Sequence, residues 1–179
     1  MDAKLPVNPV EILTDEHRIL LKKLGNLRQS VRDIQGAISA EAIQKLVADL
    51  LFFFNSEMAN HVEKEEKLLF PAFEKAVSGD KGVLDPYKSV HYDLGADMDK
   101  TINTLRSLTQ ELKDKPLSEA IPHLKELDET ISLILKRWAY HTKMEEKHLF
   151  PETERLLSKE ILHNVGKQMR QMGPAVKSH

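Results

Sequence analysis

The sequence predicts an all-α protein, an up-down-up-down four-helix bundle followed by a short fifth helix. In four long segments, apolar residues recur at alternating intervals of three and four, which is the spacing of a buried helix face. The connections between these segments are short, so consecutive helices are expected to run antiparallel. Glycines fall mostly at the interruptions, and the alternating β-branched runs typical of strands are few.

The composition is that of an ordinary chain of 179 residues, long enough for one domain with its own core. A net charge of −2 argues against a nucleic-acid or membrane-surface partner, and no apolar run is long enough to span a bilayer. The absence of cysteine excludes disulfides and thiolate metal sites. We expect a cytoplasmic protein with an N-terminal arm (1–8), a bundle domain (9–157) and a C-terminal helix and tail (158–179).

The first helix is predicted to begin at Pro9, with Asn8 as its cap, and to close at Gly36. Its inward seam is formed by Leu13, His17, Leu20, Leu24, Leu27, Val31 and Ile34. His17 therefore stands where an apolar residue belongs.

The second helix is predicted to start at a Ser39 cap. Its seam runs through Ile43, Val47, Leu50, Phe54, Met58, His61, Glu65 and Leu68. The step from Phe54 to Met58 breaks the alternation, which indicates a local change in helix winding. Pro71 is expected to bend or end this helix, because proline cannot donate to the preceding turn.

The third helix is predicted to start at Asp85 and Pro86 and to end before Pro116, and the fourth to begin between Ser118 and Pro122. The third seam contains Tyr87, His91, Leu94, Met98, Ile102, Leu105, Leu108 and Leu112. The fourth contains Leu124, Leu127, Ile131, Ile134, Trp138, His141, Glu145 and His148. A fifth helix is expected from Ser158 to about Met172.

One eleven-residue motif occurs twice, from His61 to Pro71 and from His141 to Pro151, with seven identical positions. Each copy places a histidine and a glutamate four residues apart, on one face of a helix. Counting residues from the connecting loops puts His17, His61, His91 and His141 at similar heights, to within about one turn. Four imidazoles and two carboxylates are therefore predicted to meet in the core.

Six such groups in an apolar interior are costly unless something binds them. A single zinc ion takes four ligands and would leave the remaining polar groups without a partner. Two metal ions would use all six groups. His17 and His61 would bind one ion and His91 and His141 the other, and Glu65 and Glu145 would bind both. Imidazole and carboxylate without sulfur suit iron or manganese, with zinc and copper as competitors. The alternative is that these residues are hydrogen-bonded core histidines or a structural ion network.

The order His, His-x-x-x-Glu, His, His-x-x-x-Glu, with Leu-Phe-Pro after each copy, resembles the hemerythrin-like family of HHE cation-binding domains. The resemblance spans roughly residues 9–157. It implies a four-helix bundle holding two non-haem iron ions with an oxo or hydroxo bridge. Manganese or zinc are the substitutes.

The motifs depart from those of oxygen-carrying hemerythrins, which have a second histidine one turn along the third helix. Here that position is Gly95, and Glu145 follows its histidine by four residues instead of five. The sequence is similar to the four-His, two-Glu branch, which implies open metal coordination positions.

Several neighbouring residues are candidates to complete or tune the site. Tyr87, His148 and Glu16 are candidate extra ligands or supporting groups, His148 being expected to face inward one heptad after His141. Met58 and Trp138 are expected to form the pocket wall. Glu16, Glu66 and Glu146 are expected to be solvated or to orient histidine N–H groups. We place the remaining histidines on the surface, namely His123, His163 and His179.

The leading functional hypothesis is a di-iron binding protein that takes a small ligand such as O₂ or NO, or that senses iron or redox state. The alternatives are a di-iron enzyme with peroxidase- or oxidase-type activity on a peroxide or oxygen, an iron store or donor, and a helical interaction module with a structural site. Metal and ligand binding is favoured over dedicated catalysis, and no catalytic residue is assigned. Protein partners are unassigned.

Overall fold

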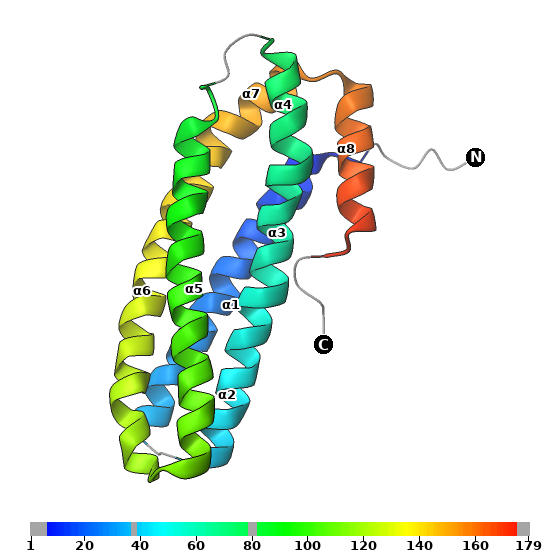
Figure 1. Ribbon diagram of the computed structural model, residues 1–179. Coiled ribbons are helices and arrows are strands. Elements are labelled where there is room, and N and C mark those ends of the chain that lie inside the picture. Colours follow the sequence, from blue (N-terminus) through cyan, green and yellow to red (C-terminus); the bar gives the residue numbers. More distant parts are fainter. Residues whose placement is uncertain (1–6, 37–38, 79–81, 175–179) are drawn as a thin grey trace, which may run out of the picture.

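The structure, a computed structural model, describes residues 7–36, 39–78 and 82–174. Those residues are almost entirely helical and contain no strand, which confirms the predicted fold class. Four long helical rods lie side by side, and a fifth helix packs beside one end of the bundle (Figure 1). The chain runs up and down the bundle, so each rod is antiparallel to the next.

The first rod is α1 (Pro9–Gly36) and the third is α5 (Asp85–Asp114). The second rod is continuous through α2 (Ala40–Phe52), η1 (Phe53–Met58), α3 (Ala59–Lys64), η2 (Glu65–Leu69) and α4 (Phe70–Ala76). The fourth follows the short turn η3 (Leu117–Glu119) and comprises α6 (Ala120–Met144), η4 (Glu145–Leu149) and α7 (Phe150–Leu156). The last helix is α8 (Lys159–Gln171).

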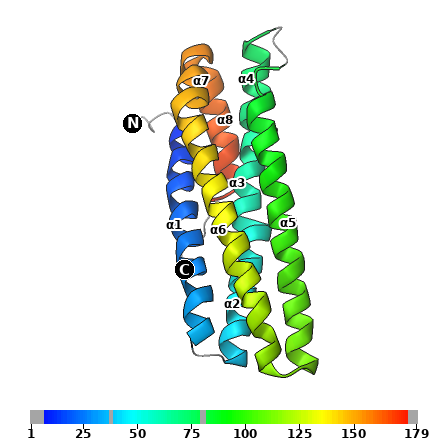
Figure 2. The ribbon, with the colours of Figure 1, turned by 90° about the vertical axis from the view of Figure 1, so that its left-hand side faces the viewer.

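The rods form a closed ring in which α1 contacts α2 and α6, and α5 contacts the same two elements from the opposite side. The α8 helix packs on α1 and η2, near the motif that begins at His61 (Figure 2). Within the described residues, none of the helices is long and apolar enough to cross a membrane.

Side-chain caps fix several helix starts where the sequence predicts them. The Asn8 side chain accepts a hydrogen bond from Val10 N–H at 3.0 Å, and Ser39 caps α2 through Ala42 N–H. Ser158 caps α8 in the same way. The α5 helix is different, because its cap position is Leu84 and Asp85 is already helical. The starts of α1, α2 and α8 are therefore set locally by hydroxyl and amide side chains.

Three π-helical turns interrupt the bundle: η1, η2 and η4. The first covers the predicted irregularity between Phe54 and Met58, which confirms the change in winding there. The other two begin at Glu65 and Glu145. Because a π turn contains one extra residue, every position after it rotates relative to the heptad pattern.

This rotation corrects two predictions about the inward seam. The prediction that His148 faces inward is wrong: its side chain is exposed, and Leu149 is 2 % exposed in its place. In the first copy the buried residue is likewise Leu69, with Leu68 only half-buried. Heptad counting fails at both places for the same reason, the widened turn after the motif glutamate.

The helix does not end at Pro71 but continues to Ala76. The N–H of Phe70, just before the proline, donates to the carbonyl of Glu65, five residues back. The α-helical hydrogen-bond pattern is therefore already interrupted at this π turn. Because Pro71 directly follows the interruption, its missing N–H does not end the helix. The same sequence of π turn and proline recurs at Pro151.

The apolar core is divided into two parts. The larger cluster contains Leu20 and Trp138 and fills the bundle toward the α1–α2 connection. The smaller contains Leu13 and Leu69 and lies toward α4, α7 and α8. On α1 the residue between Leu13 and Leu20 that faces inward is His17, which is 2 % exposed. A buried polar layer therefore separates two apolar layers.

Candidate metal centre

The polar layer consists of the six residues that the sequence predicts to meet. Each long rod contributes at least one of them, and all are 0–5 % exposed: His17, His61, Glu65, His91, His141 and Glu145. Overlapping subsets of these residues place one potential ligand atom each within 4.8 Å of one another. The structure thus brings together residues that are far apart in the chain.

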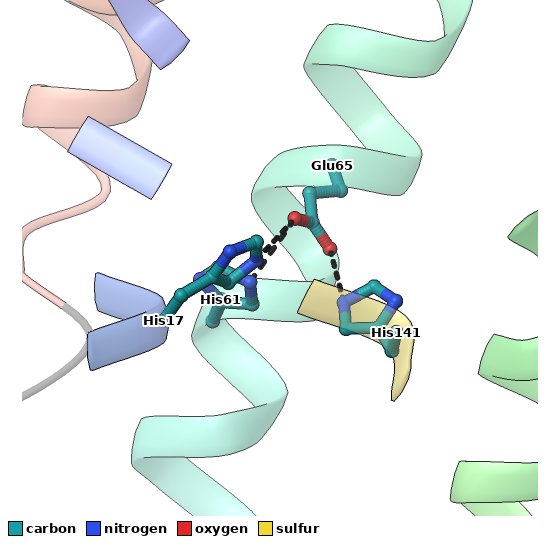
Figure 3. Close-up of side chains that lie close together, drawn as sticks. All are labelled: His17, His61, Glu65 and His141. Atoms are coloured by element: carbon teal, nitrogen blue, oxygen red, sulfur yellow. Dashed lines mark ion pairs between the residues drawn. The ribbon is translucent and has the colours of Figure 1, made fainter. Parts of the chain in front are cut away.

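Glu65 lies at the centre of the cluster (Figure 3). Its Oε1 is 3.0 Å from His61 Nε2 and 3.4 Å from His17 Nε2. Its Oε2 is 3.4 Å from His91 Nε2 and 3.8 Å from His141 Nε2. One carboxylate oxygen faces one histidine pair and the second oxygen faces the other, which is the division expected of a bridging ligand.

Glu145 approaches from the opposite rod. Its Oε2 is 3.3 Å from both His17 Nε2 and His141 Nε2, and its Oε1 is 3.9 Å from His91 Nε2. This carboxylate therefore also joins members of both pairs. The two glutamates occupy equivalent positions, each opening a π turn four residues after a motif histidine.

The atoms that face one another in this layer have no hydrogen-bond partner among the described residues. They are the four Nε2 atoms and all four oxygens of Glu65 and Glu145. Buried polar atoms are normally satisfied, and each unsatisfied one costs about 1–3 kcal/mol. Eight such atoms converging on one region fit a metal centre, because metal ions use these lone pairs without further donors.

Burial and neighbouring charges shift the titration of the cluster strongly. Burial acts to lower the pKa of His17, but the Glu145 and Glu65 carboxylates outweigh it and raise the pKa to about 10. Likewise, Glu65 and Glu66 outweigh burial and raise the pKa of His91 to about 10. Burial, together with the Glu65 charge, raises the pKa of the Glu145 carboxyl to about 8. The buried cluster of the metal-free protein therefore holds protons at neutral pH, shared between its imidazoles and Glu145.

Three further carboxylates hold the outer nitrogens of the histidines. Glu146 Oε1 is 3.0 Å from His17 Nδ1, and Glu66 Oε1 is 2.9 Å from His91 Nδ1. Each of these glutamates directly follows a central glutamate in sequence, so it points past the cluster toward the next rod. A carboxylate on the outer nitrogen fixes the ring orientation and leaves Nε2 free for a metal. These contacts agree with the predicted role of Glu66 and Glu146 in orienting histidine N–H groups, and that role stays a prediction.

The third carboxylate, Glu16, accepts from His61 Nδ1 at 3.0 Å and also pairs with Lys64. Lys64 is 0 % exposed, and sequence reasoning missed it because lysines are normally solvated. Its position three residues after His61, on the same helix face, is the signal that would have found it.

The fourth histidine, His141, has no such support: its Nδ1 is buried and lacks a partner among the described residues. The duplicated sequence explains this difference. Glu16 precedes His17, but the residue preceding His91 is Val90, and Met144 stands where the first copy has Lys64. The outer nitrogen of His61 thus has a carboxylate partner, whereas that of His141 has none among the described residues.

Aromatic rings enclose the cluster. The Trp138 ring centroid lies 4.9 Å from that of His141 and 5.2 Å from that of His61, and Met58 is fully buried in the same apolar cluster as Trp138. Phe150 stacks on His17 and Phe70 on His91, at 5.5 Å and 5.3 Å. The Phe residues belong to the repeated Leu-Phe-Pro, which sequence reasoning noted without assigning them a contact.

The remaining residues that the sequence singled out lie at the edge of the cluster or away from it. Tyr87 is half-buried, and burial together with the Glu145 charge raises the pKa of its hydroxyl. Its role as a ligand stays a prediction. His123, expected on the surface, is half-buried and pairs with Glu111 at 2.7 Å. His163, expected on the surface, is half-buried and accepts a hydrogen bond from Val7 N–H at 3.2 Å. His179 lies outside the described residues.

The chain matches a known family of protein domains. The family model described as the hemerythrin HHE cation binding domain matches residues 8–116. No curated protein matches the chain. The matched region covers α1 to α5 and includes His17, His61, Glu65 and His91, whereas the sequence resemblance was expected to reach residue 157. His141 and Glu145 lie beyond the match, so their place in the cluster rests on the repeated motif and the fold.

Proposed function

The chain belongs to the family of hemerythrin HHE cation-binding domains, and from this premise we propose that it holds two non-haem iron ions and binds a small ligand such as O₂ or NO. The observation that carries the proposal is the position of Glu65, whose two oxygens face separate histidine pairs. Family membership and the buried His/Glu cluster indicate metal binding, with iron as the metal that the family favours.

In this proposal His17 and His61 hold one ion, His91 and His141 hold the other, and Glu65 and Glu145 span both. Bound iron would supply reversible redox chemistry and affinity for diatomic molecules. The chain itself fixes the imidazoles through Glu16, Glu66 and Glu146. The apolar layers on either side exclude bulk water, which strengthens every electrostatic interaction within the centre.

An exchangeable ligand needs a coordination position that the chain does not fill. Gly95 lies one turn after His91 and contributes no side chain, and a Cβ added to it meets no heavy atom within 4 Å. The six proposed ligands leave room for an external molecule near His91. The alternatives remain turnover of peroxide or oxygen, and iron storage.

The proposal is tested by loading the protein with ferrous iron without oxygen, measuring metal content, and then admitting air or NO. We expect about two iron ions per chain and a reversible absorption change. Glu65→Gln and His61→Ala should each sharply reduce the iron content, while His123→Ala, a change at a half-buried histidine outside the cluster, should not. Unchanged metal content in both site variants would overturn the ligand assignment.

The outcome with air separates the alternatives. Rapid, irreversible oxidation with consumption of peroxide supports turnover, and continued accumulation of iron beyond two per chain supports storage. Gly95→His tests the open position, because the added imidazole should compete with the external ligand and lower its affinity. Gly95→Ala is the matched control, since it adds a side chain that cannot coordinate a metal.

A further inference from the structure

The two copies of the repeated motif differ in what covers their outer face. On each copy this face is formed by three positions spaced four residues apart, the first of them directly before the motif histidine. The positions are Asn60, Lys64 and Leu68 in the first copy and Tyr140, Met144 and His148 in the second. Because the copies align residue for residue, the two outer faces can be compared directly.

The α8 helix covers the outer face of the first copy (Figure 1). The side chain of Asn60 donates to the carbonyl oxygen of Met172, just after α8, at 3.2 Å. Leu68 is half-buried and packs against the smaller core cluster, which includes Met169 of α8. Lys64 is fully buried. The first outer face is therefore closed by a helix of the chain itself.

The outer face of the second copy is open. Tyr140 is 59 % exposed, His148 is exposed and Met144 is half-buried. A hollow of about 290 Å³ is lined by these residues together with Lys143 and Lys147, all on α6 and η4. Accessible tyrosine and methionine are typical of protein interfaces, because a tyrosine offers a large rigid surface and a methionine adapts to its partner. The second outer face therefore has the composition of a contact surface.

The charge of this face indicates the kind of partner. In the first copy Glu63 and Lys67 form an ion pair one turn apart. The equivalent residues of the second copy are Lys143 and Lys147, which place two like charges at a spacing where they destabilise a helix slightly. Among the residues that the structure describes, neither these lysines nor His148 forms an ion pair. The second outer face therefore lacks the negative charge that the first copy supplies from its own helix.

A second copy of this chain fits the face poorly. The helix that covers the first outer face is α8, which carries Lys159, Lys167 and Arg170 against the acidic residue Glu160. The α8 helix of another molecule would bring these cations against the two lysines of the hollow. Like charges across an interface oppose association, whereas carboxylates would be attracted. The face therefore suits a segment whose polar side is acidic.

We propose that the face formed by Tyr140, Lys143, Met144, Lys147 and His148 docks an acidic amphipathic helix of a partner protein, as α8 docks on the first copy. The apolar side of that helix would rest on Tyr140 and Met144, and its carboxylates would pair with the two lysines. The inference goes beyond the proposed function, and binding at this face does not depend on a metal. It places the partner directly outside the π turn that carries Glu145.

The test measures binding of synthetic peptides to the zinc-loaded protein by fluorescence anisotropy. The probe is the segment of residues 158–172 with Lys159→Glu, Lys167→Glu and Arg170→Glu, and the comparison peptide is the unaltered segment. We expect the acidic peptide to bind at least about tenfold more tightly than the unaltered one. Its affinity should fall as the salt concentration rises, because exposed charges are screened.

Two variants of the protein locate the binding site. Lys143→Glu with Lys147→Glu should weaken binding of the acidic peptide by about tenfold or more. Lys22→Glu with Lys125→Glu is the matched control, since it makes the same change of net charge at exposed lysines elsewhere. In the unaltered protein, the methyl NMR signal of Met144 should shift and saturate as the acidic peptide is added.

Several outcomes would overturn the proposal. They are no saturable binding of the acidic peptide, equal binding of the unaltered peptide, and an equal loss of affinity in the control variant. A scrambled peptide of the same acidic composition that binds as tightly would exclude recognition of an amphipathic helix. Binding to phosphatidylglycerol vesicles without binding to the acidic peptide would identify a membrane surface instead. If the protein takes up no metal but binds the acidic peptide at this face, the proposed function fails and the docking face stands.

Discussion

Glu16 Oε2 lies 3.0 Å from His61 Nδ1, and this contact has no counterpart at His141. The two histidines are equivalent in the duplicated motif, yet His61 contacts a carboxylate that also pairs with the buried Lys64, and the outer nitrogen of His141 has no partner among the described residues. A carboxylate on the outer nitrogen makes an imidazole a better and more rigid metal ligand. The two metal positions should therefore differ in affinity, with the His61 side the tighter.

Replacing Glu16 with valine, the residue found at the equivalent position 90, should destabilise the protein. Lys64 would remain buried without its partner, which costs about 3–5 kcal/mol. Glu16→Val with Lys64→Met, which copies the second half, should recover most of the stability because the buried charge is gone. Both variants should lose metal affinity by about 10–100-fold, since each leaves His61 Nδ1 unsupported.

Urea unfolding of the zinc-loaded protein measures the stability, and competition with a chelator measures the affinity. Equal stability of the single and double variants would contradict a structural role for the Glu16–Lys64 pair. Unchanged zinc affinity in both would contradict the role of Glu16 in holding His61.

Val90→Glu should strengthen the weaker side. Val90 is half-buried and precedes His91, as Glu16 precedes His17, so the new carboxylate would reach His141 Nδ1. We expect zinc release to a chelator to slow by about tenfold for the more labile ion. Ser89→Glu adds the same charge at the neighbouring exposed position. If both variants slow release equally, the effect is one of net charge and not of the His141 contact.

Metal binding should release protons and strengthen as pH rises. In the metal-free protein the Glu65, Glu66 and Glu145 carboxylates raise the pKa values of His17 and His91 to about 10, and burial raises that of Glu145 to about 8, so the cluster holds protons at pH 7. A metal ion must displace these protons, and lowering the pH favours them over the metal. Calorimetric titration with zinc in two buffers of different ionisation enthalpy measures the release. The prediction is refuted if the binding enthalpy is the same in both buffers and the zinc affinity does not change between about pH 6 and pH 8.

The π turn that begins at Glu145 predicts that substitutions at two adjacent positions differ strongly in their effect on the free energy of unfolding. Leu149→Ala should cost about 2–5 kcal/mol of unfolding free energy, because Leu149 is 2 % exposed in the smaller core cluster. His148→Ala should change it by no more than about 0.5 kcal/mol, because His148 is at the surface. Thermal unfolding of the two variants provides the comparison. A larger loss of unfolding free energy for His148→Ala than for Leu149→Ala would show that His148 faces inward, as strict heptad counting predicts.

The sequence was sufficient to predict the bundle and the meeting of four histidines and two glutamates, because inward helix positions follow from apolar spacing and heights follow from residue counts. It was not sufficient to predict which residues face inward after Glu65 and Glu145. Heptad counting assumes a constant winding, and the π turn that starts at Glu145 moves His148 outward. Lys64 was missed because its burial depends on the tertiary pairing with Glu16.

The inequality of the two halves was likewise beyond reach of the pattern alone. The motif copies share His, Glu and the trailing Leu-Phe-Pro, so they read as equivalent. What distinguishes them is Glu16, which lies outside the repeated motif and has Val90 at the equivalent position before His91. That Glu16 contacts His61 and not its neighbour His17 follows from the rotation of α1 against α3, which only the folded arrangement provides.

The order in which the rods are synthesised gives the polar layer a further consequence. A nascent chain that has emerged only through α5 carries His17, His61, Glu65 and His91, which is one complete histidine pair and half of the other. His141 and Glu145 arrive with the final rod. In the proposed two-metal assignment, both positions are therefore complete only after this last rod has docked. Metal bound there would hold α6 and η4 against the rods made first.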